Sequence, residues 1–253
     1  SWGYEDDPWK RRFMKIAVMS DIHGNLEALD AVLEDIGSQR IEKIVCIGDL
    51  IGYGPNPEEV IQKIRQIDVC CTMGNHELGI LFKLERKWFN PKARKSLSLT
   101  EKLLSPESLD FIAGLPNTHT LNNNLFVHGF PPASVKTYLF EKDTDEIARW
   151  FLTPGPKLTF VGHTHDLELV AWDGRKADRH PLHQDRLVLD KSKYIINVGS
   201  VGQPRDGDNR AKYVIWDPVE ESIEVRFVPY DIQTTVDKIM ERGFPEYNAT
   251  RLW

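Results

Sequence analysis

Short apolar runs alternate with segments of helical periodicity in the first third of the chain. Residues 14–19, 44–47 and 69–73 are apolar runs of the length expected for buried strands. Between them, apolar residues spaced three or four positions apart predict helices over 26–36 and 60–64. Strands that alternate with helices in this way indicate βαβ units and a largely parallel sheet covered on both faces. The pattern therefore predicts an α/β protein.

The segment 78–115 interrupts this pattern. It is rich in charged residues, has helical periodicity and contains no strand-like run. Ser105 followed by Pro106 is typical of an N-cap and the first helical position, so a helix is predicted to begin there. We expect a helical insertion at 78–115 and regard it as a candidate lid.

Strand-like runs return after Pro116. They cover residues 125–128, 158–162, 168–172, 186–189, 194–198, 213–216 and 223–228, and a helix through 236–240 follows them. Without a repeat or a low-complexity tract, residues 13–253 are expected to form one domain. Residues 1–12 have no periodicity and are interpreted as a flexible N-terminal extension.

Charge and cysteine content narrow the functional classes. Among 253 residues, 32 Lys and Arg stand against 38 Asp and Glu, which gives a net charge of −6. Proteins that bind nucleic acid mainly through phosphates normally have a basic excess, so nucleic acid is not the expected partner. Cys46, Cys70 and Cys71 lie in apolar runs without metal-type spacing, and no apolar stretch suits a membrane span or a signal peptide. We expect a cytoplasmic protein.

Metal-competent side chains follow the predicted strands at their ends. They are Asp21, His23, Asp49, Asn75, His76, His128, His163 and His165. Ligands of α/β proteins bind at the carboxyl ends of strands, where residues distant in sequence meet. Each residue taken singly has a simpler interpretation, as a helix cap, a turn residue or a surface histidine. Together they predict a metal site, whereas His119, His180 and His183 are expected in loops.

The donor types indicate which ions the site would hold. Oxygen and imidazole donors without thiolate suit Mn, Fe, Co, Ni or Zn, and Mn is the first expectation. Without His76 the set has seven members, which is too many for one tetrahedral ion and suits two ions sharing a carboxylate. Two divalent ions about 3.5–4 Å apart are a known arrangement for in-line attack at phosphorus.

Five segments carry a resemblance to a known family. They are SDIHGN at 20–25, GD at 48–49, GNHE at 74–77, VHG at 127–129 and GHTH at 162–165. In this order they resemble the five motifs of the calcineurin-like metallophosphoesterase superfamily. The resemblance implies a four-layer sandwich, in which two mixed β-sheets are flanked by helices.

The resemblance also implies a role for each residue. One metal ion would be held by Asp21, His23, Asp49 and His165. Asp49 would bridge to a second ion, held also by Asn75, His128 and His163. A hydroxide bridging both ions would attack phosphorus, and His76, outside the ligand set, would stabilise charge and protonate the leaving oxygen.

The second motif indicates the branch of the superfamily. Protein Ser/Thr phosphatases have an aspartate where Gly52 stands, an arginine at Tyr53 and another at Met73, so this subclass is disfavoured. The segments GDLIGYGPNPEEVI and NVGSVGQPRDGD resemble instead the small prokaryotic phosphodiesterase-like branch. That branch is associated with small phosphodiesters and, in some members, with dinucleoside polyphosphates.

Three residues are candidates for substrate contacts. Arg205 follows a strand end and could form a bidentate contact to phosphate, although an ion pair with Asp206 or Asp208 is an equal alternative. Asn90 and Arg94 lie in the helical insertion, which could present them and Phe89 to the substrate. For Phe89 and Trp88, packing in the core is the more frequent use of such aromatics.

These observations favour a two-metal phosphoesterase acting on a small phosphodiester or nucleotide. A phosphomonoesterase or protein phosphatase, and a dinucleoside polyphosphate hydrolase, are alternatives within the same chemistry. A non-catalytic scaffold of the same fold and a nuclease are alternatives from other classes. The expected partner is a small phosphorylated substrate, and binding to a membrane is not expected. The sequence leaves the oligomeric state open.

Overall fold

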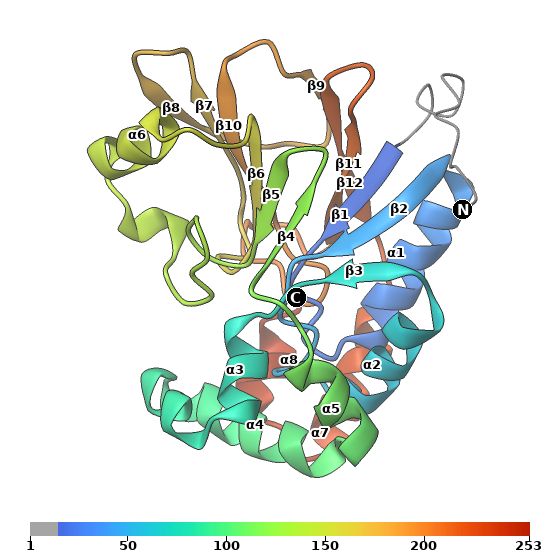
Figure 1. Cartoon of the computed structure of the whole chain (residues 1–253). Helices are drawn as coiled ribbons and strands as arrows, with labels where there is room; N and C mark the ends of the chain where they lie inside the picture. Colours follow the sequence, from blue (N-terminus) through green and yellow to red (C-terminus); the bar gives the residue numbers. More distant parts are fainter. Residues whose placement is uncertain (1–14) are drawn as a thin grey trace, which may run out of the picture.

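Two six-stranded sheets lie face to face in the computed structural model, which describes residues 15–253 (Figure 1). The predicted extension 1–12 lies outside the described residues. The first sheet has the order β3 (Val69–Cys71), β2 (Ile41–Cys46), β1 (Lys15–Met19), β11 (Ala211–Asp217), β12 (Ser222–Val228), β9 (Arg186–Val188). The second has the order β4 (Thr118–Leu121), β5 (Asn124–Val127), β6 (Leu158–Val161), β10 (Lys193–Val198), β7 (Leu167–Trp172), β8 (Ala177–Pro181).

Both sheets are mixed, as the family resemblance implied. β1, β2 and β3 are parallel, and so are β5, β6 and β10. The remaining neighbours, such as β11 and β12 or β7 and β8, are antiparallel. The expectation of a largely parallel sheet therefore holds for β1 to β3 and for β5, β6 and β10 but is wrong for the other strands. Short connections reverse the chain between β4 and β5, β7 and β8, and β11 and β12.

Helices cover the outer face of each sheet. They are α1 (Leu26–Ser38), α2 (Pro57–Gln66), α3 (Asn75–Leu81), α4 (Pro91–Leu103), α5 (Pro106–Ala113), α6 (Thr144–Leu152), α7 (Ile232–Glu241) and α8 (Glu246–Thr250), with 3₁₀ turns η2 (Lys83–Trp88) and η3 (Leu139–Glu141). α1 and α2 pack on the first sheet, α6 packs on the second, and α3, α4, α5, α7 and α8 gather at one end (Figure 1).

The period-2 alternation of the strands builds the layers. In β1, Ile16 and Val18 point between the sheets, whereas Ala17 and Met19 point to the helices. The inter-sheet core also contains Phe126 and Phe160, whose rings stack at 4.9 Å. The ends of β1, β2, β5 and β6 are thereby held beside one another.

The segment 78–115 is helical, as predicted. Ser105 is the N-cap of α5, because its side chain accepts a hydrogen bond from the Ser108 amide at 3.1 Å. Phe89, Ala93 and Leu97 are buried in the same core as the α1 side chains. Motion of this segment as a lid stays a prediction.

Several elements were missed by the sequence pattern. β4 and β8 carry exposed or mixed residues, so their apolar periodicity is weak; α6 is amphipathic, with Ile147 and Phe151 buried on one face, but is not among the predicted helices. As a consequence, the expectation that His119 and His180 lie in loops is wrong: His119 lies in β4 and His180 in β8. Within residues 15–253, no helix combines the length and apolar character needed to cross a membrane.

A partly buried ionic hydrogen-bond group fastens α1 to the first sheet. The Asp35 carboxylate accepts hydrogen bonds from the Tyr213 hydroxyl at 2.7 Å and from Arg226 Nη2 at 2.8 Å. The hydrogen bond from Arg226 lowers the pKa of Asp35, against the opposing effect of burial.

We predict that Asp35→Ala lowers the free energy of unfolding by about 2 kcal/mol, because the buried Tyr213 hydroxyl loses its acceptor. Since the folded-state pKa is depressed, this contribution is present above the unfolded pKa of about 4 and declines as the pH falls below it. Urea unfolding at pH 7 and pH 3 measures both effects. Asp30→Ala, an exposed carboxylate on the same helix, should change stability by less than about 0.5 kcal/mol; equal losses in the two variants would contradict the prediction.

Candidate metal centre

The eight metal-competent residues meet at the edge where strand ends of both sheets lie together. Asp21 and His23 follow β1, Asp49 follows β2, Asn75 and His76 follow β3, His128 follows β5, and His163 and His165 follow β6. All eight are at most 3% exposed. The structure thus brings together every residue of the predicted ligand set and His76.

The backbone at these strand ends turns sharply. Five of the eight residues have a positive φ: Asp21 (56°), His23 (51°), Asp49 (52°), His163 (70°) and His165 (64°). Left-handed backbone is uncommon outside glycine, and it is enriched at functional sites where the surroundings enforce it. Here it directs consecutive strand-end side chains toward one point.

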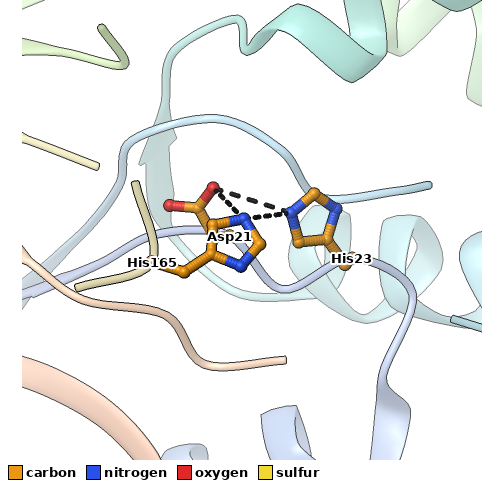
Figure 2. A group of neighbouring side chains, drawn as sticks. All are labelled: Asp21, His23 and His165. Carbon is orange, nitrogen blue, oxygen red and sulfur yellow. Dashed lines mark hydrogen bonds and ion pairs between the residues drawn. The ribbon is translucent and has the colours of Figure 1, made fainter. Parts of the chain in front are cut away.

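Asp21, His23 and His165 form the first cluster (Figure 2). The Nε2 atoms of His23 and His165 are 2.9 Å apart, and Asp21 Oδ1 lies 3.2 Å from His165 Nε2 and 3.6 Å from His23 Nε2. Figure 2 shows these three atoms turned toward one another. Such a triangle of donors can hold a metal ion.

Asp49, His128 and His163 form a second cluster beside the first. Asp49 Oδ2 lies 3.3 Å from His128 Nε2, and 3.6 Å from His23 Nε2 of the first cluster. His128 Nε2 is also 3.0 Å from Asn75 Oδ1 and 3.1 Å from His163 Nδ1. Asp49 is therefore the carboxylate that both clusters can reach.

Backbone carbonyls fix the ring orientation of four histidines. The carbonyl partners are Ile51 for His23 Nδ1 (3.0 Å), Ile47 for His128 Nδ1 (2.7 Å), Lys136 for His163 Nε2 (2.9 Å) and Gln203 for His165 Nδ1 (2.6 Å). A carbonyl only accepts, so each of these ring nitrogens carries the proton. The other nitrogen of each ring then faces the cluster, which is the orientation of metal-binding histidine.

The donor set fits cations. Asp21 Oδ1 is buried and accepts no hydrogen bond within the described part of the chain. Burial opposes protonation of His128, but the carboxylates of Asp49 and Asp21 outweigh it and raise the pKa of His128 to about 10. Burial lowers the pKa of the adjacent His163 to about 3. Inward-facing imidazole nitrogens beside two buried carboxylates are a donor set that fits divalent cations.

His76 differs from the other four histidines. Its backbone amide donates to Asp49 Oδ1 at 2.9 Å, and its Nε2 is 4.0 Å from Asp49 Oδ2, close enough to group with Asp49 and His23. Its Nδ1 is buried without a partner among residues 15–253. A Cβ atom at Gly52, where φ is +131°, would lie 2.1 Å from that nitrogen. Gly52 thus leaves room for the ring but does not fix its tautomer.

Glu77 is a residue that the sequence placed in a motif without assigning it a role. Its buried carboxylate accepts the backbone amides of Asp49 (2.9 Å), Leu50 (2.8 Å) and Gly74 (2.8 Å). Burial and the charge of Asp49 raise the pKa of Glu77 to about 7, and the amides oppose that rise. Glu77 therefore fixes the turn that carries Asp49 against the turn that begins α3.

A cavity of about 340 Å³ opens over the two clusters. Its wall includes Arg205 and Asn90, two of the predicted substrate contacts. Asn90 caps α4 with its side-chain oxygen, so its amide nitrogen is the group available to the cavity. Arg94 is exposed on α4 and does not line this cavity. It follows Ala93 in the helix and therefore lies off the buried face that Ala93 and Leu97 form.

The structure decides between the two interpretations of Arg205. Asp206 pairs with Lys212 at 2.6 Å, and Asp208 pairs with Arg210 at 2.6 Å. Arg205 instead donates from Nη2 to Gln203 Oε1 at 3.1 Å and faces the Tyr53 ring at 5.9 Å. It is thus beside the cavity and not in the ion pair.

Four aromatic side chains line the cavity, and two of them, Tyr53 and Tyr138, are not among the substrate contacts predicted from the sequence. Tyr138 stacks on His163 with ring centres 3.7 Å apart, and Tyr53 packs against His23 and His76 at 4.7 Å. Trp88 is 44% exposed, whereas Phe89 is 7% exposed and packs edge-on against His76. Tyr138 lies in a long connection with no motif of its own, so its position follows only from the fold.

The protein is thus a two-sheet α/β sandwich, and its adjoining His/Asp clusters could hold metal ions. The family model of calcineurin-like phosphoesterases matches residues 14–167. An uncharacterized protein of Methanocaldococcus jannaschii is 39% identical over 244 residues, covering 94% of this chain and 97% of that protein. The chain belongs to the calcineurin-like phosphoesterase family, and membership implies a metal-dependent phosphoric ester hydrolase.

Solved structures agree with this family. A metallophosphoesterase from Sphaerobacter thermophilus is 36% identical, with a TM-score of 0.82 over 94% of this chain and 98% of that one. A hypothetical protein from Pyrococcus horikoshii, at 20% identity, shares the fold with a TM-score of 0.76 over 95% and 98% of the two chains.

We predict that Glu77→Gln lowers the free energy of unfolding by about 2 kcal/mol, because one acceptor becomes a donor that faces backbone amides. The displaced Asp49 turn should also reduce the amount of Mn²⁺ bound. Denaturant unfolding and metal analysis after dialysis against Mn²⁺ measure the two effects. Glu107→Gln, an exposed carboxylate on α5, is the control; a Glu77→Gln protein with wild-type stability and metal content would disprove this role.

Proposed function

We propose that the protein holds two divalent metal ions and hydrolyses a small phosphodiester or nucleotide. The observation that carries this proposal is the ring orientation of four histidines, each held by a backbone carbonyl so that its other nitrogen faces Asp21 or Asp49. Buried lone pairs and carboxylates so close together repel one another unless cations lie between them. Mn²⁺ is the first ion to test, with Fe, Ni, Co and Zn as alternatives.

The proposed ligand sets follow the two clusters. One ion is assigned to Asp21, His23, Asp49 and His165, and the other to Asp49, Asn75, His128 and His163. When bound, two such ions supply Lewis acidity toward phosphoryl oxygens and lower the pKa of water for in-line attack. The protein's own contribution is to hold seven donors in place and to exclude bulk water by burial.

His76 is assigned a different role. It lacks the carbonyl partner that fixes the other rings, it lines the cavity, and burial lowers its pKa. A ring in this position can donate a hydrogen bond to the charge that develops on phosphate and can pass a proton to the leaving oxygen. We therefore place His76 outside the ligand set.

The same features weigh against a non-catalytic scaffold, since every proposed ligand and His76 are present and directed inward. They do not distinguish a diester from a monoester. All three cysteines are free thiols, although Cys46 and Cys71 are direct neighbours on adjacent strands. Buried cysteines without metal-type spacing are typical of proteins in a reducing compartment, so we propose a cytoplasmic location.

We expect hydrolysis of bis(4-nitrophenyl) phosphate that depends on Mn²⁺ and stops when the metal is removed. Asp49→Ala should lose both bound metal and activity, whereas His76→Ala should keep the metal and lose about 10²–10⁴-fold in kcat. Metal analysis and nitrophenolate release measure both quantities, with His183→Ala, an exposed histidine elsewhere, as the control. Full activity of Asp49→Ala and His76→Ala would refute the proposal, and a wild-type protein that binds no Mn²⁺ would favour the scaffold.

We also predict that Gly52→Ala lowers kcat while bound metal stays at the wild-type level. The added Cβ would lie 2.1 Å from His76 Nδ1 and must displace that ring, which the ligand set does not include. Gly37→Ala, where an added Cβ meets nothing within 4 Å, is the matched control. Equal kcat values for Gly52→Ala and wild type would show that the position of the His76 ring does not matter.

A further inference from the structure

A second cavity adjoins the metal cavity on the far side of Arg205. It has a volume of about 260 Å³, and its wall includes Pro204, Arg205, Asp208, Arg251 and Trp253. Arg205 lines both cavities. Arg205 is therefore the residue that the two cavities share, and the proposed reaction does not use the second cavity.

Arg205 has donor capacity for a ligand. Its backbone amide donates to the carbonyl of His165 at 3.2 Å, which fixes it beside the first metal cluster. Its Nη2 binds Gln203, and its Nε is buried without an acceptor among residues 15–253. A buried guanidinium nitrogen without a partner is costly unless a ligand oxygen completes its hydrogen bonds.

Arg251 and Trp253 are held in place by their neighbours. Asn248, in α8, donates to the Tyr53 carbonyl at 2.8 Å and to Ser96 Oγ at 2.9 Å. Leu252, between the two residues, is 3% exposed and packs with Ile239 and Phe244. The Trp253 ring is nevertheless 64% exposed. An exposed indole in the same cavity wall as two guanidinium groups can stack on a planar ring.

The charge of the second cavity is positive where a ligand would enter it. Asp208 contributes an acidic group, but Arg210 binds both of its oxygens, at 2.6–3.1 Å, and Lys212 lies 3.8 Å from it. Asp206 is paired with the buried Lys212. Within residues 15–253, neither Arg205 nor Arg251 takes part in an ion pair. Two arginines thus remain to bind an anion.

We propose that the second cavity binds the part of a nucleotide substrate that is not cleaved. Arg205 and Arg251 contact a phosphoryl group next to the scissile one, and the base stacks on Trp253. The substrate class is then a nucleotide with at least two phosphoryl groups. This assignment rests on the proposed function in one respect, namely that the scissile phosphoryl group lies over the metal clusters.

Titration of the metal-free protein with ADP, by calorimetry, tests the second cavity without any turnover. We expect measurable binding by the wild type and about tenfold weaker binding by Arg251→Met, the loss expected for one charged hydrogen bond. Trp253→Ala should weaken binding similarly, whereas Trp253→Phe, which keeps an aromatic ring, should stay within threefold of wild type. Arg175→Met, an exposed arginine in the β7–β8 turn, is the matched control.

Hydrolysis of bis(4-nitrophenyl) phosphate separates this proposal from the proposed function, because this diester has no second phosphoryl group. Arg251→Met should hydrolyse it within twofold of the wild-type rate. The second-cavity proposal is overturned if the wild type does not bind ADP, if Arg251→Met and Trp253→Ala bind it as tightly as wild type, or if Arg251→Met loses diester hydrolysis. Absence of Mn²⁺-dependent hydrolysis by the wild type would instead contradict the proposed function, and the ADP titration would still decide on the second cavity.

Discussion

The buried carboxylate of Asp49 is the group around which the rest of the site is arranged. It is reached by imidazoles that follow β1, β3 and β5, and its turn is held by the Glu77 carboxylate through backbone amides. An unpaired buried charge is unfavourable by several kcal/mol, roughly, so its surroundings must supply cations or strong donors. That requirement explains why the strands of two different sheets end at one place.

The two-sheet architecture is what makes this convergence possible. Each sheet contributes parallel strands whose carboxyl ends meet at one edge, β1 to β3 from the first sheet and β5 and β6 from the second. The helical segment after α3 then adds a wall of aromatic side chains over that edge. Arg205 lines both the metal cavity and the second cavity, whose wall also includes Arg251 and Trp253, which follow α8.

The sequence predicts the chemistry of the centre better than its surroundings. Asp21, Asp49 and the histidines stand in short motifs after clearly apolar strands, so their meeting point could be inferred. The exposed strands β4 and β8 lack a clear alternation, which is why His119 and His180 were misplaced in loops. Arg94 and Asn90 are both predicted to contact the substrate because they are close in sequence. Arg94, however, lies on the exposed face of α4 and does not line the metal cavity. Tyr138 and Arg251 reach the cavities through tertiary packing, which no local pattern encodes.

The positive φ angles of Asp21, His23, Asp49, His163 and His165 carry a consequence for how such a site can change over time. Aspartate, asparagine and histidine are among the side chains that tolerate this backbone, and they are also metal ligands. Selection for this backbone geometry and selection for metal coordination therefore favour the same few residue types. A descendant that no longer needed metal would be freed from the second pressure only. The residues at its strand ends would be replaced by glycine or asparagine and not by valine or isoleucine. The left-handed turns would therefore be retained after the metal ligands were lost.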